Sequence, residues 1–136
     1  MTITKTAIVR ELVPLLFVDD IQSCVDFYIH KLGFSMEMKW EPGGKLAWCR
    51  LRRDQSAIML QQACAEDGPA NQRGRGIGFY FNCDDVNAMY ADVLARGLKV
   101  DPPKAAHYGE NQLSLRDPGE YSLIFQSPVG NHQNKQ

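Results

Sequence analysis

The chain has 136 residues, of which 44% are hydrophobic and 23% are charged, and its net charge is -1. A chain of this length predicts one domain, large enough to bury most of its apolar surface without a disulfide or a structural metal. Proteins that bind nucleic acid or anionic membranes carry a basic excess, so the charge balance argues against both classes.

The cysteines and the N-terminus indicate the cellular location. Cys24, Cys49, Cys64 and Cys83 form no CxxC pair, and all but Cys64 fall within predicted helices or strands. We interpret them as mostly buried free thiols, which are typical of a reducing compartment. No signal sequence is recognisable, and no apolar run approaches the ~20 residues of a membrane span. We therefore expect a cytoplasmic protein without a membrane segment.

The first part of the chain predicts a strand, a helix and three further strands. Residues 1–10 are predicted to form a short arm or an extra edge strand. The elements that follow are a buried strand over 12–18, a helix from Asp20 to Gly33, and strands over 34–40, 46–51 and 55–62. Asp19 or Asp20 can cap the helix, and Gly33 can end it. Residues 41–44 have the composition of a hairpin turn.

The second part of the chain repeats this plan. Its elements are a strand over 77–82, a helix over 84–96, a short strand over 98–100, and strands over 112–116 and 121–126. Asp84-Asp85 corresponds to Asp19-Asp20, and Gly97 corresponds to Gly33, which indicates an internal duplication. Residues 63–76 are small, polar and glycine-rich, as in a linker or a mobile flap, and residues from 128 onward form a polar tail.

Three local patterns allow a comparison with known families. They are residues 13–18 leading into Phe27-Tyr28 and 32–34, the helix start at Asp84-Asp85-Val86, and Tyr108-Gly109 followed by Asp117-Pro118 before the last strand. With the duplication, these patterns resemble the vicinal oxygen chelate superfamily of glyoxalases, dioxygenases and bleomycin-resistance proteins. The resemblance implies an α+β fold with tandem βαβββ modules that form a curled mixed sheet around a cleft. It implies a single domain over 1–136, with modules at about 12–62 and 77–126 joined by the linker 63–76.

Metal-dependent members of that superfamily place one ligand on each of four strands. The resemblance carries these positions onto Val13, Met59, Gly78 and Ile124. None of these side chains can coordinate a divalent cation, which requires carboxylate, imidazole or amide donors. We therefore expect no metal and no cofactor, and a function similar to the metal-free bleomycin-resistance branch, whose members sequester a drug without catalysis.

Strand alternation predicts which side chains line the cleft, because residues two apart share a face. The candidate ligand-binding residues are Trp40, Trp48, Arg50, Met59, Gln61, Tyr80, Asn82, His107 and Ile124. A mostly apolar, partly aromatic surface with a few polar groups is typical of a small-molecule site. The same pattern is equally compatible with Trp48 as a core residue and with the arginines as a solvated strand face.

Three hypotheses follow for the function. The first is a binding protein for an aromatic or amphipathic small molecule, with bleomycin as the named example. The second is an enzyme of the same superfamily, either a glyoxalase-like lyase or isomerase, or a metal-free enzyme that uses Tyr80, His107 or Glu110. The third, compatible with both, is an interaction or regulatory module that buries an apolar sheet face in a homodimer, since modules from two subunits commonly shape each cleft in similar proteins.

Overall fold

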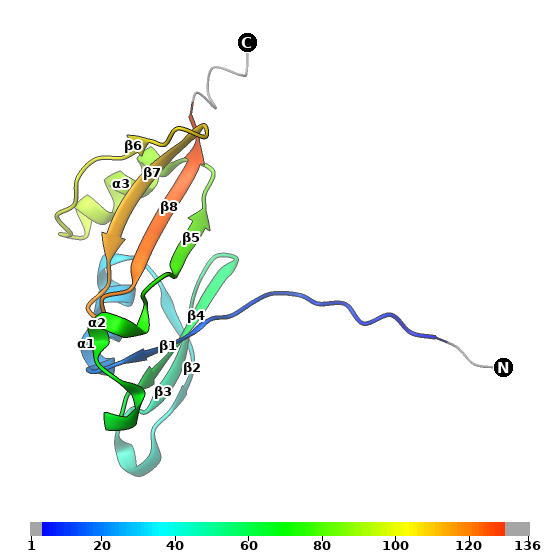
Figure 1. The fold of residues 1–136 in the computed structure, drawn as a ribbon, viewed down its shortest axis with the longest axis vertical. Helices are drawn as coiled ribbons and strands as arrows, with labels where there is room; N and C mark the ends of the chain where they lie inside the picture. The colour runs from blue at the N-terminus through cyan, green and yellow to red at the C-terminus, as the bar shows by residue number, and fades with distance from the viewer. Residues whose placement is uncertain (1–3, 130–136) are drawn as a thin grey trace.

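The computed structural model describes residues 4–129. Residues 1–3 and 130–136, which include most of the predicted polar tail, lie outside this range. The described chain forms two four-stranded sheets with helices packed against them, which confirms the α+β class (Figure 1).

Sheet A comes from the first half of the chain and sheet B from the second. The strands of sheet A are β1 (Leu15–Val18), β2 (Ser35–Trp40), β3 (Trp48–Arg53) and β4 (Ser56–Gln62). The strands of sheet B are β5 (Gly78–Asn82), β6 (Lys104–Ala105), β7 (Glu110–Arg116) and β8 (Ser122–Pro128). In each sheet the first strand pairs in parallel with the fourth, and the other neighbours are antiparallel. The orders β1-β4-β3-β2 and β5-β8-β7-β6 therefore repeat one plan.

The main helix of each half begins at the predicted aspartate cap. The helices are α1 (Ile21–Asp26), the π-helix η1 (Phe27–Lys31), the 3-10 helices η2 (Pro42–Gly44) and η3 (Ala65–Asp67), α2 (Ala70–Arg73) and α3 (Val86–Ala95). The Asp20 carboxylate accepts the N–H of Ser23, and the Asp85 carboxylate accepts that of Asn87. The first helix has one residue more than the second between its capping aspartate and its terminal glycine, and the wider π turn accommodates it.

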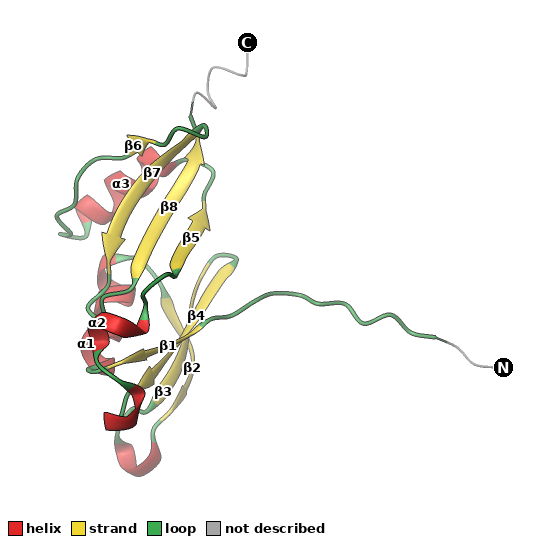
Figure 2. Ribbon diagram, in the orientation of Figure 1, coloured by secondary structure: helices red, strands yellow, loops and turns green. Residues whose placement is uncertain are grey.

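One apolar core joins the two halves of the chain. Figure 2 shows sheets A and B one after the other along the molecule, with α1 and α3 on the same side of them. Alternate strand residues point into this core, among them Leu16, Val18, Leu60, Leu123 and Phe125. Burial of each such side chain contributes about 2 kcal/mol. The remaining residues of each strand form an open face, away from the helices.

A buried hydrogen bond also links the two halves. Tyr28 of η1 is fully buried, and its Oη donates to Oδ2 of Asp117 at 2.5 Å. Oδ1 of Asp117 accepts the backbone N–H of Tyr121 at 2.9 Å. Burial raises the pKa of Asp117 and that of Tyr28, so the phenol keeps its proton and acts as the donor. Among residues 4–129 only Asp117 and Ser127 are polar and buried, so this contact is an exception in an otherwise apolar core.

The N-terminal residues form an extended arm rather than an edge strand. Residues 4–13 have no regular secondary structure and project away from the sheets (Figure 1). Pro14 accepts the N–H of Met59 at 2.8 Å but has no N–H of its own, so the ladder with β4 ends there. The arm exposes three large apolar side chains, Ile8 (73% exposed), Val9 (90%) and Leu12 (89%).

Two features differ from the sequence prediction. The short strand predicted over 98–100 is wrong, because Leu98 and Val100 pack against the core without pairing. β6 forms later, beyond the two prolines at 102 and 103 that have no N–H to contribute to a ladder. The linker 63–76 contains η3 and α2 and is therefore not a structureless flap. No helix within residues 4–129 is long and apolar enough to cross a membrane.

Candidate functional site

The open face of sheet A carries two cross-strand rows of side chains. The first row is Leu15, Met59, Arg50 and Met38, and the second is Phe17, Gln61, Trp48 and Trp40. In each row the residues come from β1, β4, β3 and β2 in that order. Side chains directly opposite one another on neighbouring strands are in contact distance. The register therefore brings five of the predicted ligand-binding residues onto one surface.

The two tryptophans form a cross-strand pair on this surface. Trp40 lies opposite Trp48 and remains 60% exposed, and Trp48 is half-buried. Met38, beside them on β2, is 50% exposed. The side chains of the opposite face, such as Cys49 and Leu51, are completely buried. Trp48 is thus part of the open face and not of the core, while its role in ligand binding stays a prediction.

The arginines of this face are held in ion pairs. Arg50 Nε donates to Oε1 of Glu37 at 2.7 Å, and Arg52 Nε donates to Oε2 of the same carboxylate at 2.7 Å. Arg52 also donates to both oxygens of Glu11 at the base of the arm, at 2.8 and 3.3 Å. The hydrogen bonds from Arg52 and Arg50 lower the pKa of Glu37, so this carboxylate is ionised at neutral pH.

The open face of sheet B is polar at one end, and at the other Tyr80 lies opposite Ile124. Asn82, Gln126 and Gln112 are neighbours on β5, β8 and β7. Gln126 donates to Asn82 Oδ1 at 3.0 Å, and Gln112 donates to Gln126 Oε1 at 3.0 Å. Gln112 also donates to the hydroxyl of Tyr108. These amides satisfy one another and form a neutral ladder, which can hydrogen-bond to carbonyl or hydroxyl groups of a ligand.

Several pockets border sheet B, and two of them are of ligand size. One, of about 600 Å³, is lined by Tyr80 and Ile124 together with Gly78, Arg75 and the turn that precedes β5. The other, of about 580 Å³, lies where β5 meets α3 and is lined by Asn82, Phe81 and Cys83 among others. Both volumes are within the range of small-molecule sites.

The predicted site residues therefore divide into two groups. Trp40, Trp48, Arg50, Met59 and Gln61 lie on sheet A. Tyr80, Asn82 and Ile124 lie on sheet B. His107 is exposed in the turn before β7, where its ring stands at 65° to that of Tyr108 with centroids 5.4 Å apart. Their ligand-binding roles remain predictions.

The positions that would hold a metal in similar proteins are occupied by non-ligating residues. Met59 lies between Leu15 and Arg50, and Ile124 lies opposite Tyr80. Val13 and Gly78 offer no side-chain donor either. Within residues 4–129 no three His, Cys, Asp or Glu side chains form a group that could share a metal ion.

The thiols are not poised for nucleophilic chemistry. Cys24 and Cys49 are buried, and this burial raises the pKa of Cys24 to about 12 and that of Cys49 to about 11. Cys64 is exposed, but hydrogen bonds with the carboxylates of Glu66 and Asp67 raise its pKa to about 11. The nucleophilic species is the thiolate, so these cysteines are inert at neutral pH.

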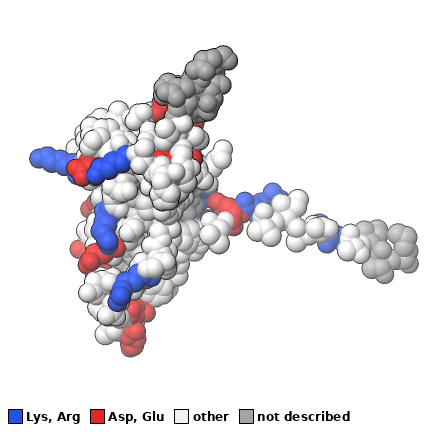
Figure 3. Space-filling view, turned by 45° about the horizontal axis from the view of Figure 1, so that its top comes forward, with Lys and Arg blue, Asp and Glu red and all other residues white. Residues whose placement is uncertain are grey.

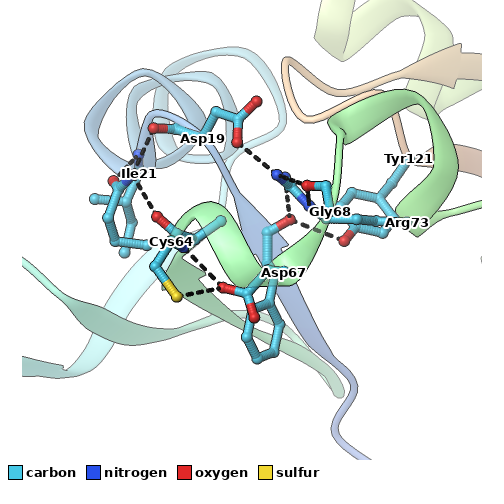
Figure 4. Close-up of polar contacts among 10 residues, drawn as sticks. Asp19, Ile21, Cys64, Asp67, Gly68, Arg73 and Tyr121 are labelled. Carbon is cyan, nitrogen blue, oxygen red and sulfur yellow. Dashed lines mark hydrogen bonds and ion pairs between the residues drawn. The ribbon is translucent and has the colours of Figure 1, made fainter.

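Sequence reasoning missed the role of Arg73 in the linker. Its guanidinium is mostly buried and donates to Asp19 at 2.6 Å, to the carbonyl of Phe17 at 3.3 Å and to the carbonyl of Gly68. Figure 4 shows Arg73 between Asp19 and Gly68, with the Asp67 carboxylate bound to Cys64 alongside. The linker is therefore tied to the end of β1, and no local sequence pattern marks this contact.

We expect Arg73→Ala to lower the free energy of unfolding by about 2 kcal/mol, because it removes a buried charge with several partners and leaves backbone carbonyls unpaired. Urea unfolding of the variant and of wild type measures the difference. Arg75→Ala, in the same linker but exposed, is the matched control and should change stability by less than about 0.5 kcal/mol. Equal effects of the two changes would contradict a specific role for Arg73.

Comparisons with known proteins agree with this architecture. Residues 8–125 match the family model described as the Glyoxalase/Bleomycin resistance protein/Dioxygenase superfamily. No curated protein matches the chain. Among solved structures, a bleomycin-binding protein complexed with bleomycin is similar with a TM-score of 0.71 and 17% identity, over 88% of this chain and 98% of that one.

Two further solved structures show the range of similar proteins. TnmS3, an antibiotic binding protein from Streptomyces sp. CB03234, has a TM-score of 0.64 and 24% identity, over 90% of this chain and all (100%) of its own. A glyoxalase-related enzyme from Clostridium phytofermentans has a TM-score of 0.71 and 16% identity, with coverage of 93% and 100%. At such identities the likeness shows the fold alone. Because the family model extends from the arm to β8, the chain belongs to the Glyoxalase/Bleomycin resistance protein/Dioxygenase superfamily.

Proposed function

We propose that this protein binds and sequesters an aromatic or amphipathic small molecule on the open face of sheet A, without a metal ion. The observation that carries the proposal is the exposed pair of Trp40 and Trp48, flanked by Met38, Met59 and Phe17 on one surface. A contiguous exposed apolar patch, unlike a single exposed aromatic side chain, commonly marks a binding surface. Stacking on an indole contributes about 1 kcal/mol beyond the burial of apolar area.

The chemistry of the rest of the site supports binding rather than catalysis. The four positions that correspond to metal ligands have no donor groups, and the arginines of sheet A are engaged with carboxylates. Similar folds include proteins whose names state that they bind bleomycin or another antibiotic, so an antibiotic is a reasonable class of ligand. The free thiols of the described residues support a reducing, cytoplasmic location.

Tryptophan fluorescence tests the proposal directly, because both tryptophans lie on the proposed face. We expect saturable quenching by micromolar N-phenylnaphthylamine, an uncharged aromatic probe. A parallel titration with metal-free bleomycin decides whether that antibiotic is itself a ligand. Flat titrations with both compounds, or Ni, Zn, Mn or Fe bound near stoichiometry after purification, would contradict the proposal and favour the superfamily enzyme.

We also propose that the protein acts as a homodimer in which the arm of each subunit packs on the other. The arm stands clear of its own chain, with its base held by Glu11 on Arg52 (Figure 3). An extended segment of about ten residues spans roughly 33 Å, enough to cross a neighbouring subunit. A symmetric exchange would bury Ile8, Val9 and Leu12 twice, once for each arm.

Removal of residues 4–10 is therefore expected to convert the dimer to a monomer at micromolar concentration, as measured by light scattering after gel filtration. The double variant Ile8→Ser/Val9→Ser, which keeps the arm but removes apolar area, should weaken the dimer in the same direction. Thr4→Ser/Thr6→Ser is the matched control in the same segment. A wild-type protein that is monomeric, or a dimer indifferent to loss of the arm, would exclude the exchange.

A further inference from the structure

The carboxylate of Glu37 pairs with both arginines of the aromatic face. Each oxygen of Glu37 accepts one short hydrogen bond, from Arg50 and from Arg52, both at 2.7 Å. No ion pair of the described residues joins Arg50 to any other carboxylate. Glu37 is thus the group that prevents an approaching anion from pairing with the guanidinium of Arg50.

A bulge in β2 brings Met38 to the same face as Glu37. The register between β2 and β3 shifts between Met36 and Met38. Met36 lies opposite Leu51, which is completely buried, and it packs against the core. Met38 lies opposite Arg50 on the open face. Residues two apart normally share a face, so the extra residue between them has reversed the alternation.

The bulge therefore places two consecutive side chains, Glu37 and Met38, on the open face. Glu37 follows the inward-facing Met36 in regular alternation, and the bulge turns Met38 and, two residues later, Trp40 to the same face. The carboxylate of Glu37 consequently lies beside Arg50, which is two residues from Trp48 on the same face of β3.

The charges of this face balance. Arg52 is shared between Glu37 and Glu11, so the two guanidinium groups are matched by two carboxylates. Among the described residues, both arginines on this face are therefore already paired with carboxylates. An ion that displaced either partner would leave the other charge unpaired.

We propose that Glu37 is a specificity-determining residue, which restricts the aromatic face to uncharged ligands by occupying Arg50 and Arg52. This inference rests on the proposed function, since it concerns the ligand of that same face. The expected ligand class is a planar aromatic molecule whose polar groups are neutral, such as carbonyl, hydroxyl or amide groups.

Two probes that share one aromatic skeleton test the inference. N-phenylnaphthylamine is neutral, and anilinonaphthalene sulfonate adds one negative charge to the same rings. Wild type should bind the neutral probe at least about tenfold more tightly than the sulfonate. In Glu37→Gln the affinity for the sulfonate relative to the neutral probe should rise about tenfold, because Arg50 is released and can bind the sulfonate.

Two further variants complete the experiment. Glu41→Gln makes the same change in net charge on a neighbouring carboxylate that pairs with Lys39, and it should leave the ratio of the two affinities unchanged. The double variant Glu37→Gln/Arg50→Gln should return the ratio to near the wild-type value. Glu37 and Glu41 are exposed and Arg50 is partly exposed, so the variants are expected to fold, which circular dichroism checks.

The outcomes separate this inference from the proposed function. Absence of binding of the neutral probe to wild type would overturn the proposed function and this inference with it. Binding of the neutral probe, combined with an unchanged ratio in Glu37→Gln or an equal change in Glu41→Gln, would overturn only the role of Glu37. The expected pattern in all three variants would support both.

Discussion

Replacement of Asp117 by alanine is expected to lower the free energy of unfolding by about 3 kcal/mol. The change leaves two buried donors without an acceptor, the hydroxyl of Tyr28 and the backbone N–H of Tyr121. It also leaves a cavity in a region that is otherwise tightly packed, since Gly119 lies close to both Val18 and this carboxylate. Urea unfolding of both proteins, followed by circular dichroism, measures the difference.

Two controls show whether the loss comes from the link between the halves of the chain. Asp101→Ala removes an exposed aspartate and should change stability by less than about 0.5 kcal/mol. Tyr28→Phe, which removes the donor and keeps the ring, should cost about 1–2 kcal/mol. We further propose that the modules form a single domain, so wild type should unfold in one transition. A stability of Asp117→Ala within about 0.5 kcal/mol of wild type would contradict this account.

Loss of both indoles is expected to weaken the binding of N-phenylnaphthylamine about a hundredfold. Each of Trp40→Ala and Trp48→Ala should cost about tenfold, since each removes stacking surface and apolar area from the proposed face. Because the variants lack a tryptophan, the fluorescence of the probe or calorimetry should be the measurement. Trp40→Phe, which keeps an aromatic ring, should cost less than Trp40→Ala.

Binding of the ligand at sheet B instead of sheet A would give the opposite result for these variants. If the ligand occupied the pocket of about 600 Å³ beside sheet B, Tyr80→Ala would weaken binding and the tryptophan variants would not. Tyr80 is 54% exposed, so its replacement should leave the fold intact. The comparison therefore decides between the two open faces.

Much of the fold could be predicted from short-range patterns. The acidic pairs at 19–20 and 84–85 predicted helix starts, and both helices begin within two residues of them. The alternation of β3 and β4 predicted a common face for Trp48, Arg50, Met59 and Gln61, and the strand register has this arrangement. These signals succeed because a cap and a pleat depend on residues only a few positions apart.

The errors came from segments whose structure depends on distant partners. Leu98 and Val100 have the apolar character of a strand, but they pack against the core and no neighbouring strand pairs with them. The linker has the composition of a flexible loop, yet Arg73 is held by the carbonyl of Phe17 and the carboxylate of Asp19, more than fifty positions earlier. Local composition cannot report such contacts.

The sequence by itself determined the repeated order of strands and helices and the side chains that alternate toward one face, because both follow from local periodicity, and the resemblance to a known family implied the class of the fold. Only the tertiary structure decided that a bulge brings Trp40 opposite Trp48, that Glu37 pairs with Arg50 and Arg52, and that Tyr28 meets Asp117. A bulge reverses the alternation on which the prediction relies, and pairing across strands depends on register. Physical contact between distant residues is therefore what defines the candidate site.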